Sequence, residues 1–216
     1  MDNIARVSVR VATVASMRWD NLFDDLESQL EQGLTAEELD LKAEEERLRL
    51  GRLGLRDRIT AILHAQKFDP AYGIRFTLRG GQSLSLRPVA IGKDWLSADL
   101  LDDSTRRAQC VLPFPAIAGI ILTPPQVQQS LNPPSPRDAE PGITSRLGLT
   151  FVLRDLCRRR REVSVRLADG DLHGTIDRVG RDHFDLAVHE SGAARRDSAV
   201  FSYRMIPLDQ LLLVLL

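Results

Sequence analysis

Three stretches of the chain have an apolar residue at every second position. These are Ile74, Phe76 and Leu78, then Val163, Val165 and Leu167, and finally Phe184, Leu186 and Val188. Side chains at every second position of a strand share one face, so this period predicts strands with one buried face. Gly80-Gly81 and Asp169-Gly170 follow the first two stretches, and glycine allows the positive φ of a tight hairpin turn.

Residues 17–54 have a helical spacing instead. Apolar side chains recur at i, i+3 and i+4 near its start, at Trp19, Leu22, Phe23, Leu26 and Leu30. Thr35 and Glu38 form a capping-box pattern that starts a second, charged helix towards Leu50. We interpret 17–54 as an acidic helical arm. Its apolar face is a candidate protein-interaction surface, which either docks on a partner or packs on the chain's own body or on a second copy.

Two segments, 55–122 and 143–216, follow the same order of features. Each begins with a helical stretch and continues through a strand and glycine turn to Ile91-Gly92 or Val179-Gly180. Each ends with Phe114-Pro115 or Ile206-Pro207 before a last apolar strand. The shared order indicates an internal duplication, each unit being a helix followed by five short strands. Because so small a sheet must hide its edges, we predict a mainly β, α+β fold with two tandem small barrels.

The two segments flank a proline-rich stretch. Six of the eleven prolines lie in 123–142. Since proline removes backbone donors and restricts its neighbours, we predict an extended, exposed linker there, with a proline-motif ligand as the alternative. Residues 1–16 are interpreted as an extension, which either forms a strand through alternating valines or precedes a start at Met17.

The unit at 143–216 resembles the Sm-like (LSm) small barrel. The resemblance is carried by Val165-x-Leu167-x-Asp169-Gly170, Gly174-x-Ile176, Val179-Gly180, Phe184-Asp185-Leu186 and Ile206-Pro207-Leu208. The first unit matches more loosely, through Phe76-x-Leu78-x-Gly80-Gly81, Ile91-Gly92, Trp95-Leu96 and Phe114-Pro115. Other SH3-like barrels share much of this pattern, and the whole layout also resembles uncharacterised proteins of high-GC, actinobacterial-type bacteria.

The resemblance implies barrels that pair through edge strands, and the apolar run 211–216 is expected to end the chain as such a strand. Sm-like proteins bind RNA through a polar pair near the third strand and an Ile-Arg-Gly turn near the end. This chain has Asp185, Ser97 or Ala98, and Tyr203-Arg204-Met205 at those places. The nucleotide pocket of the family is therefore not expected here.

Charge is distributed unevenly along the chain. Residues 17–50 carry a net charge of −7, whereas the chain from residue 51 onward carries +5. The most basic sites are the candidate nucleic-acid surface, comprising Arg154, Arg158, Arg159, Arg160 and Arg161, with Arg106, Arg107, Arg195 and Arg196 in loops. Guanidinium groups bind phosphates bidentately. Two other roles stay open, namely complementing a helix C-terminal dipole and pairing with the acidic arm.

The sequence contains none of the familiar phosphate-binding, nucleophile-elbow or zinc-binding motifs. His173, His183 and His189 lack metal-ligand spacing, as do Cys110 and Cys157, so we predict no metal, cofactor or catalytic residue. Trp95 and Phe184, interpreted as equivalent positions, are assigned to the barrel cores in preference to base stacking.

No apolar run reaches the roughly 18–20 residues of a membrane span, and unpaired cysteines suit the reducing cytoplasm. We therefore expect a non-catalytic cytoplasmic scaffold that associates with itself or binds another protein, without a small-molecule substrate. RNA binding through Arg158 to Arg161 is the alternative.

Overall fold

The computed structural model describes residues 26–28, 38–65, 72–101, 108–132, 142–190 and 200–216. The chain divides into two compact units, residues 1–53 and 54–216, and each is described by itself. Most of the apolar face predicted for the acidic arm lies outside the described residues, namely Trp19, Leu22, Phe23 and Leu30. The predicted extension 1–16 lies outside them as well.

The first unit contains a helix over residues 38–51, and Leu26 lies exposed on a short helical turn at 26–28. Arg47 pairs with Glu44 at 3.3 Å, and Arg49 pairs with Glu46 at 2.6 Å. Both pairs are three residues apart, the spacing that brings side chains together on a helix surface. The predicted charged helix is therefore present, although its predicted cap at residue 35 lies outside the described residues.

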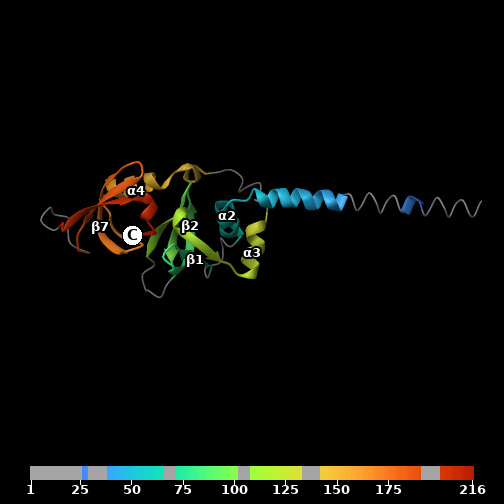
Figure 1. Ribbon diagram of the computed structural model, residues 1–216, viewed down its shortest axis with the longest axis horizontal. Coiled ribbons are helices and arrows are strands. Elements are labelled where there is room, and N and C mark those ends of the chain that lie inside the picture. The colour runs from blue at the N-terminus through green and yellow to red at the C-terminus, as the bar shows by residue number, and fades with distance from the viewer. Residues whose placement is uncertain (1–25, 29–37, 66–71, 102–107, 133–141, 191–199) are drawn as a thin grey trace, which may run out of the picture. The chain divides into compact units, whose positions relative to one another are not determined.

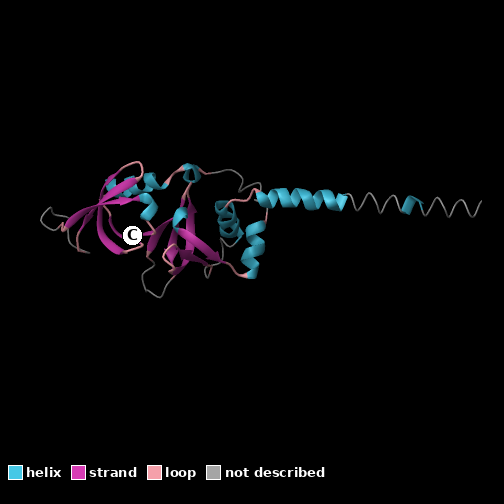
Figure 2. Ribbon diagram, in the orientation of Figure 1, coloured by secondary structure: helices cyan, strands magenta, loops and turns pink. Residues whose placement is uncertain are grey.

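The second unit is built on one antiparallel sheet of ten strands, drawn in magenta in Figure 2. From edge to edge the order is β5-β1-β2-β3-β4-β10-β6-β7-β8-β9. The first five strands are β1 (Ile74–Leu78), β2 (Ser83–Ile91), β3 (Trp95–Leu100), β4 (Gln109–Pro113) and β5 (Ile117–Ile121). The others are β6 (Glu162–Leu167), β7 (Gly170–Val179), β8 (His183–Val188), β9 (Ser202–Pro207) and β10 (Leu213–Leu215). The fold is thus mainly β with helices, as predicted.

The first five and the last five strands are arranged in the same order. In each half the fifth strand pairs with the first, and the second, third and fourth follow. A bulge interrupts the second strand of each half, between Pro88 and Ala90 in β2 and between Ile176 and Arg178 in β7. A 3-10 helix precedes each last strand, η1 (Phe114–Ala116) and η4 (Leu208–Gln210). The two halves nevertheless share one open sheet, so the predicted pair of closed barrels is not shown.

A helix precedes each half and packs its apolar face on that half. Ile59 and Ile62 of α2 (Leu55–Ala65) are buried in the first hydrophobic core, and Leu153 and Leu156 of α4 (Leu149–Arg158) in the second. Each such side chain contributes about 1.5–3 kcal/mol when fully buried. A short 3-10 helix, η2 (Ile143–Arg146), begins the second helical stretch. No helix in the described ranges combines the length and apolar composition of a membrane span.

The proline-rich segment is helical in its first part. Pro124–Leu131 forms α3, which packs against α2, as Figure 1 shows. Pro124 and Pro125 lie in the first turn, where backbone N–H groups have no acceptor within the helix, so their missing donors cost nothing. The Thr123 N–H donates to Gln126 Oε1 at 3.0 Å, which completes a capping box. The prediction of an extended linker is therefore wrong for these residues, and 133–141 lie outside the described ones.

The apolar C-terminal run is an interior strand and not an edge. β10 pairs with β4 on one side and with β6 on the other. Because both rows of its backbone groups are used, this strand is closed to a further partner, and the prediction of an edge at 211–216 is wrong. The edges of the sheet are β5 and β9.

Candidate protein-interaction surface

The two halves of the sheet join where β4 meets β10. Val111 lies opposite Val214 and Cys110 lies opposite Leu215. The Leu216 N–H adds a hydrogen bond of 2.8 Å to the carbonyl of residue 109. Val111 belongs to the first half, yet it is buried in the core of the second together with Val214. The joint therefore consists of strand pairing backed by apolar burial.

A carboxylate of the first half caps the helix of the second. The Leu149 N–H, in the first turn of α4, donates to Asp94 Oδ1 at 2.7 Å. The N-cap residue of α4 is Gly148, which offers no side-chain acceptor. Asp94 thus takes the place of an N-cap side chain, and its charge complements the positive end of the helix dipole.

Trp95 reaches from the first half into the core of the second. Its indole is buried, and its Nε1–H donates to the Leu147 carbonyl at 2.9 Å. The same carbonyl accepts the Lys93 N–H at 2.9 Å. Gly92 makes room for the ring, because an added Cβ would lie 2.2 Å from the indole nitrogen. The turn before β3 is therefore shaped around this contact.

The strand register corrects two predicted equivalences between the halves. Trp95 lies opposite Pro113 in the β3–β4 hairpin, and His183 lies opposite Pro207 in the β8–β9 hairpin. Trp95 therefore corresponds to His183 and not to Phe184, and Pro207 corresponds to Pro113 and not to Pro115. The prediction that Trp95 and Phe184 are core residues is confirmed, since both are buried.

The edge strand β9 and the residue just before it expose a row of large apolar side chains. Phe201, Tyr203 and Met205 are 70%, 59% and 70% exposed. Counted back from the corresponding prolines, Met205 takes the place of Val111, which is only 2% exposed. β9 is therefore an uncovered counterpart of a strand that is covered inside the chain.

Within the chain, the first half packs against β10 and the start of α4. The corresponding surface of the first half, formed by β5 and the start of α2, is exposed at the opposite end of the sheet. The tetrapeptide Arg-Leu-Gly-Leu occurs twice, at 52–55 and at 146–149. The last residue of the second tetrapeptide, Leu149, is buried at 5% exposure. The last residue of the first, Leu55, is 45% exposed. On the edge strand β5, Ile121 is 54% exposed. The repeated tetrapeptide is the sequence signal for this surface, and hydrophobic periodicity does not detect it.

The arginine cluster lies at the end of α4. Arg158 and Arg159 both pair with Asp155 at 2.7 Å. The hydrogen bond from Arg158, aided by the charge of Arg159, holds the pKa of the Asp155 carboxyl below its usual range. Arg154 is exposed on the same helix. One carboxylate thus offsets part of the positive charge, and RNA binding by this cluster stays a prediction.

The predicted nucleic-acid surface also includes four arginines in loops. Arg106, Arg107, Arg195 and Arg196 lie outside the described residues.

Arg160 has a structural role in ending α4. Its φ is 51°, its N–H donates to the Cys157 carbonyl, and the Arg161 N–H donates to the Leu156 carbonyl. This pair of bonds is a Schellman motif, whose left-handed position favours glycine. We expect Arg160→Gly to stabilise the fold by about 1 kcal/mol in urea unfolding, since side chains are strained at positive φ. Arg161→Gly is the matched control and should give no gain; equal effects of the two changes would contradict this assignment.

The histidines predicted to lack metal-ligand spacing make structural hydrogen bonds. His189 Nε2 lies 2.8 Å from Thr175 Oγ1, and His173 Nδ1 lies 3.0 Å from Ser164 Oγ. His183 Nδ1 lies 2.8 Å from the Asp182 carboxylate. Within the described ranges, no three His, Cys, Asp or Glu side chains are grouped to hold a metal ion.

The described thiols differ in their surroundings. Burial raises the pKa of the Cys110 thiol to about 12. Cys157 is half-buried and its Sγ lies 3.3 Å from the carbonyl of Asp177. Cys110 is therefore a thiol at neutral pH and packs as a small apolar residue.

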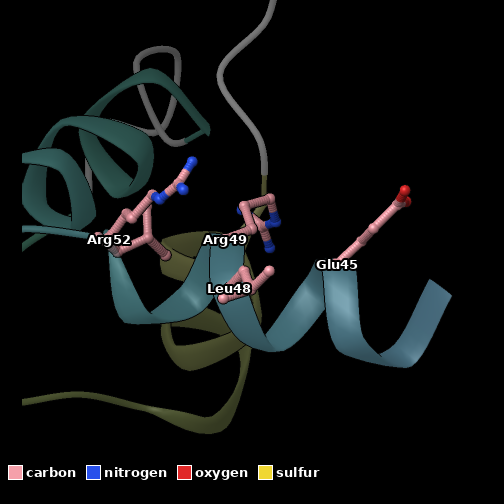
Figure 3. A pocket seen from close by; sticks show the side chains of 5 residues that line it. Glu45, Leu48, Arg49 and Arg52 are labelled. Carbon is pink, nitrogen blue, oxygen red and sulfur yellow. The ribbon is translucent and has the colours of Figure 1, made fainter. Parts of the chain in front are cut away.

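A hollow on the first unit lies along the end of the helix 38–51. Figure 3 shows its lining, which consists of Glu45, Leu48, Arg49, Arg52 and Leu53. All five residues belong to one helix and the turn that follows it, and Glu45 points away from the arginines. Because polar groups do not converge from separate elements, we assign no ligand site to this hollow.

Comparison with known proteins gives no information on function, so function is inferred from the geometry of the sheet edges. No family model, curated protein or solved structure matches the chain.

Proposed function

We propose that this protein is a non-catalytic scaffold built on two tandem Sm-like small barrels. It binds protein, first of all copies of itself, through the open edges of its sheet. The observation that carries the proposal is a row of exposed side chains, formed by Phe201 just before β9 and by Tyr203 and Met205 of β9.

The composition of β9 supports this role. An edge strand presents unpaired backbone groups, and proteins that stay monomeric protect such edges with charges, prolines or bulges. β9 has Arg204 as its one charged residue and its proline only at the end, Pro207. Its partner β8 pairs with it from Val188↔Ser202 to His183↔Pro207 without a bulge. A regular edge with large apolar side chains is suited to pairing with another strand.

The internal arrangement supports the family interpretation. Each half has a preceding helix, five antiparallel strands in one order and a 3-10 corner before the last strand. These are the features that the resemblance to Sm-like barrels predicts, and pairing through edge strands is what the resemblance implies. The β4–β10 joint is one such pairing within the chain.

The test is the mass of the purified chain by light scattering over a concentration series. The wild type should exceed the monomer mass of 24.1 kDa, and Met205→Glu should return it to the monomer, because a carboxylate on β9 opposes burial. Val89→Glu is the matched control, since Val89 is 59% exposed on the interior strand β2. A wild type that stays monomeric up to about 100 µM, a range reaching ordinary micromolar affinities, would contradict self-association.

A further inference from the structure

We propose that a second copy of the chain covers β9, using its edge strand β5 and the start of its helix α2. The contact repeats, between copies, the joint that links β4 to β10 within one chain. This inference rests on the self-association proposed above and names the surfaces that meet.

The strand correspondence fixes a register for the contact. Within the chain, Val214 lies opposite Val111 and Leu215 lies opposite Cys110. Ile120 corresponds to Val214, because Ile120 lies opposite Phe76 on β1 as Val214 lies opposite Val165 on β6. Transferred to two copies, the same pairing places Ile120 opposite Met205 and Ile121 opposite Arg204.

The turn before β8 matches the turn that caps α4. Gly92 and Gly180 each donate an N–H to the carbonyl three residues later, at 2.8 and 2.9 Å. Asp182 therefore stands where Asp94 stands, one residue before the third strand. The hydrogen bond from His183 holds the pKa of Asp182 below its usual range, so the group is a carboxylate at neutral pH.

The start of α2 corresponds to the helix start that Asp94 caps within the chain, and there the Gly54 N–H donates to Asp57 Oδ2 at 3.0 Å. Gly54 corresponds to Gly148, the N-cap residue of α4, because the last residue of each Arg-Leu-Gly-Leu tetrapeptide is the first residue of a helix. In the joint within the chain, the N–H of Leu149 meets Asp94. Between two copies, the N–H of Leu55 would meet Asp182 of the neighbour.

The contact would bury one exposed apolar residue of each element that takes part in it. Leu55, Ile121 and Met205 are 45%, 54% and 70% exposed. Their counterparts in the internal joint, Leu149 and Val111, are buried, and Leu215 is partly buried. The surface at β9 and the surface at β5 are both exposed in one chain. A second copy of the chain carries the complement of each, so a single kind of partner covers both.

Because the two surfaces differ, the assembly is head to tail. Each copy would use β9 towards one neighbour and β5 towards the other. Such heterologous contacts give a ring when the rotation closes and a filament when it does not. A symmetric pair of β9 strands would instead stop at a dimer.

Mixing two variants with opposite blocked edges tests this arrangement. Met205→Glu blocks β9, and Ile121→Glu blocks β5. Head-to-tail pairing predicts that each variant alone is a monomer by light scattering. An equimolar mixture should form a dimer and nothing larger, since one intact β9 and one intact β5 remain.

Two other outcomes would overturn the inference. If Ile121→Glu alone still dimerised, β9 would pair with itself, and self-association would stand without β5. If both variants kept the wild-type mass, association would use neither edge. A monomeric wild type would instead remove the proposed self-association, so the two failures are distinguishable.

A cysteine pair tests the register. Ile121→Cys with Arg204→Cys should yield a ladder of covalent oligomers after mild oxidation, because opposite residues of paired strands suit a disulfide. Ile121→Cys with Val89→Cys is the control and carries the same native thiols. Oligomers that form without this ladder, or with an equal ladder in the control, would contradict the register.

The proposed cap has its own readout. Asp182→Ala should weaken association about fivefold, as expected for the loss of one helix cap. Asp169→Ala, in the exposed β6–β7 turn, is the matched control and should leave the dissociation constant unchanged. Equal constants for the two variants would remove Asp182 from the contact.

Discussion

Replacing Gly174 with alanine is expected to destabilise the folded chain by about 3 kcal/mol, at the upper end of overpacking effects. An added Cβ would lie 2.1 Å from the carbonyl oxygen of Ala187 and 2.9 Å from its carbonyl carbon. Both are backbone atoms of β8, which is hydrogen-bonded to β7 on one side and β9 on the other. Because β8 is held from both sides, it cannot move away without breaking strand pairs.

The measurement is urea unfolding followed by far-UV circular dichroism. Gly119→Ala is the matched control, because Gly119 also lies in a strand but nothing is within 4 Å of its added Cβ. The control should change the free energy of unfolding by less than about 0.5 kcal/mol. A loss below about 1 kcal/mol for Gly174→Ala would show that the strands adjust, contrary to this prediction.

Hydrophobic periods predicted those elements that bury one face. Ile74, Phe76 and Leu78 are all buried in the first core, and their alternation was enough to place β1. The helical stretch predicted at the start of the first unit is α2, which buries Ile59 and Ile62. Hydrophobic periodicity indicates that one face of a helix or strand is buried, and each of these elements buries one face in the fold.

Periods do not say which strands are neighbours. The unbroken apolar run 211–216 was predicted as an edge strand, but β10 lies inside the sheet. An unbroken apolar run is typical of a strand covered on both faces, and this interpretation agrees with its position. Conversely, Phe201, Tyr203 and Met205 alternate as if they faced a core, and only the structure shows that they are exposed.

The proline-rich segment was misjudged because composition outweighed position. Pro124 and Pro125 fall in the first helical turn, where proline is tolerated. The capping-box pair Thr123 and Gln126 was visible three residues apart and favours a helix start. Counting prolines hid a signal that their placement made clear.

At the candidate site, too, local patterns predict some features and long-range pairing determines the others. The charge pairing of the arginine cluster could have been predicted, because Asp155 lies three and four residues before Arg158 and Arg159. The joint could not, since it depends on the pairing of β4 with a strand about a hundred residues later, a separation that local patterns do not reach. Gly148 gave no hint of its cap, because the acceptor comes from Asp94.

Replacing Trp95 with alanine is expected to cost about 4 kcal/mol, within the range for large aromatic truncations in cores. The indole belongs to β3 but packs in the second core with Leu149, so its loss opens a cavity between the halves. It also removes the hydrogen bond to the Leu147 carbonyl. Since Trp95 joins the two cores, we expect the unfolding transition of the variant to be broader than that of the wild type.

Two further variants separate the effect of the cavity on stability from the effect of the lost hydrogen bond and from the effect of changing the turn. Trp95→Phe keeps an aromatic ring and should cost only about 1–1.5 kcal/mol, because the Leu147 carbonyl still accepts the Lys93 N–H. His183→Ala changes the corresponding residue at the uncovered end, where the side chain is 39% exposed. It should change monomer stability by less than about 0.5 kcal/mol. If Trp95→Ala and His183→Ala had equal effects on the monomer, the covered and uncovered ends of the sheet would not differ as the structure requires. A large difference between them would agree with a buried Trp95 that joins the two cores and an exposed His183 that does not.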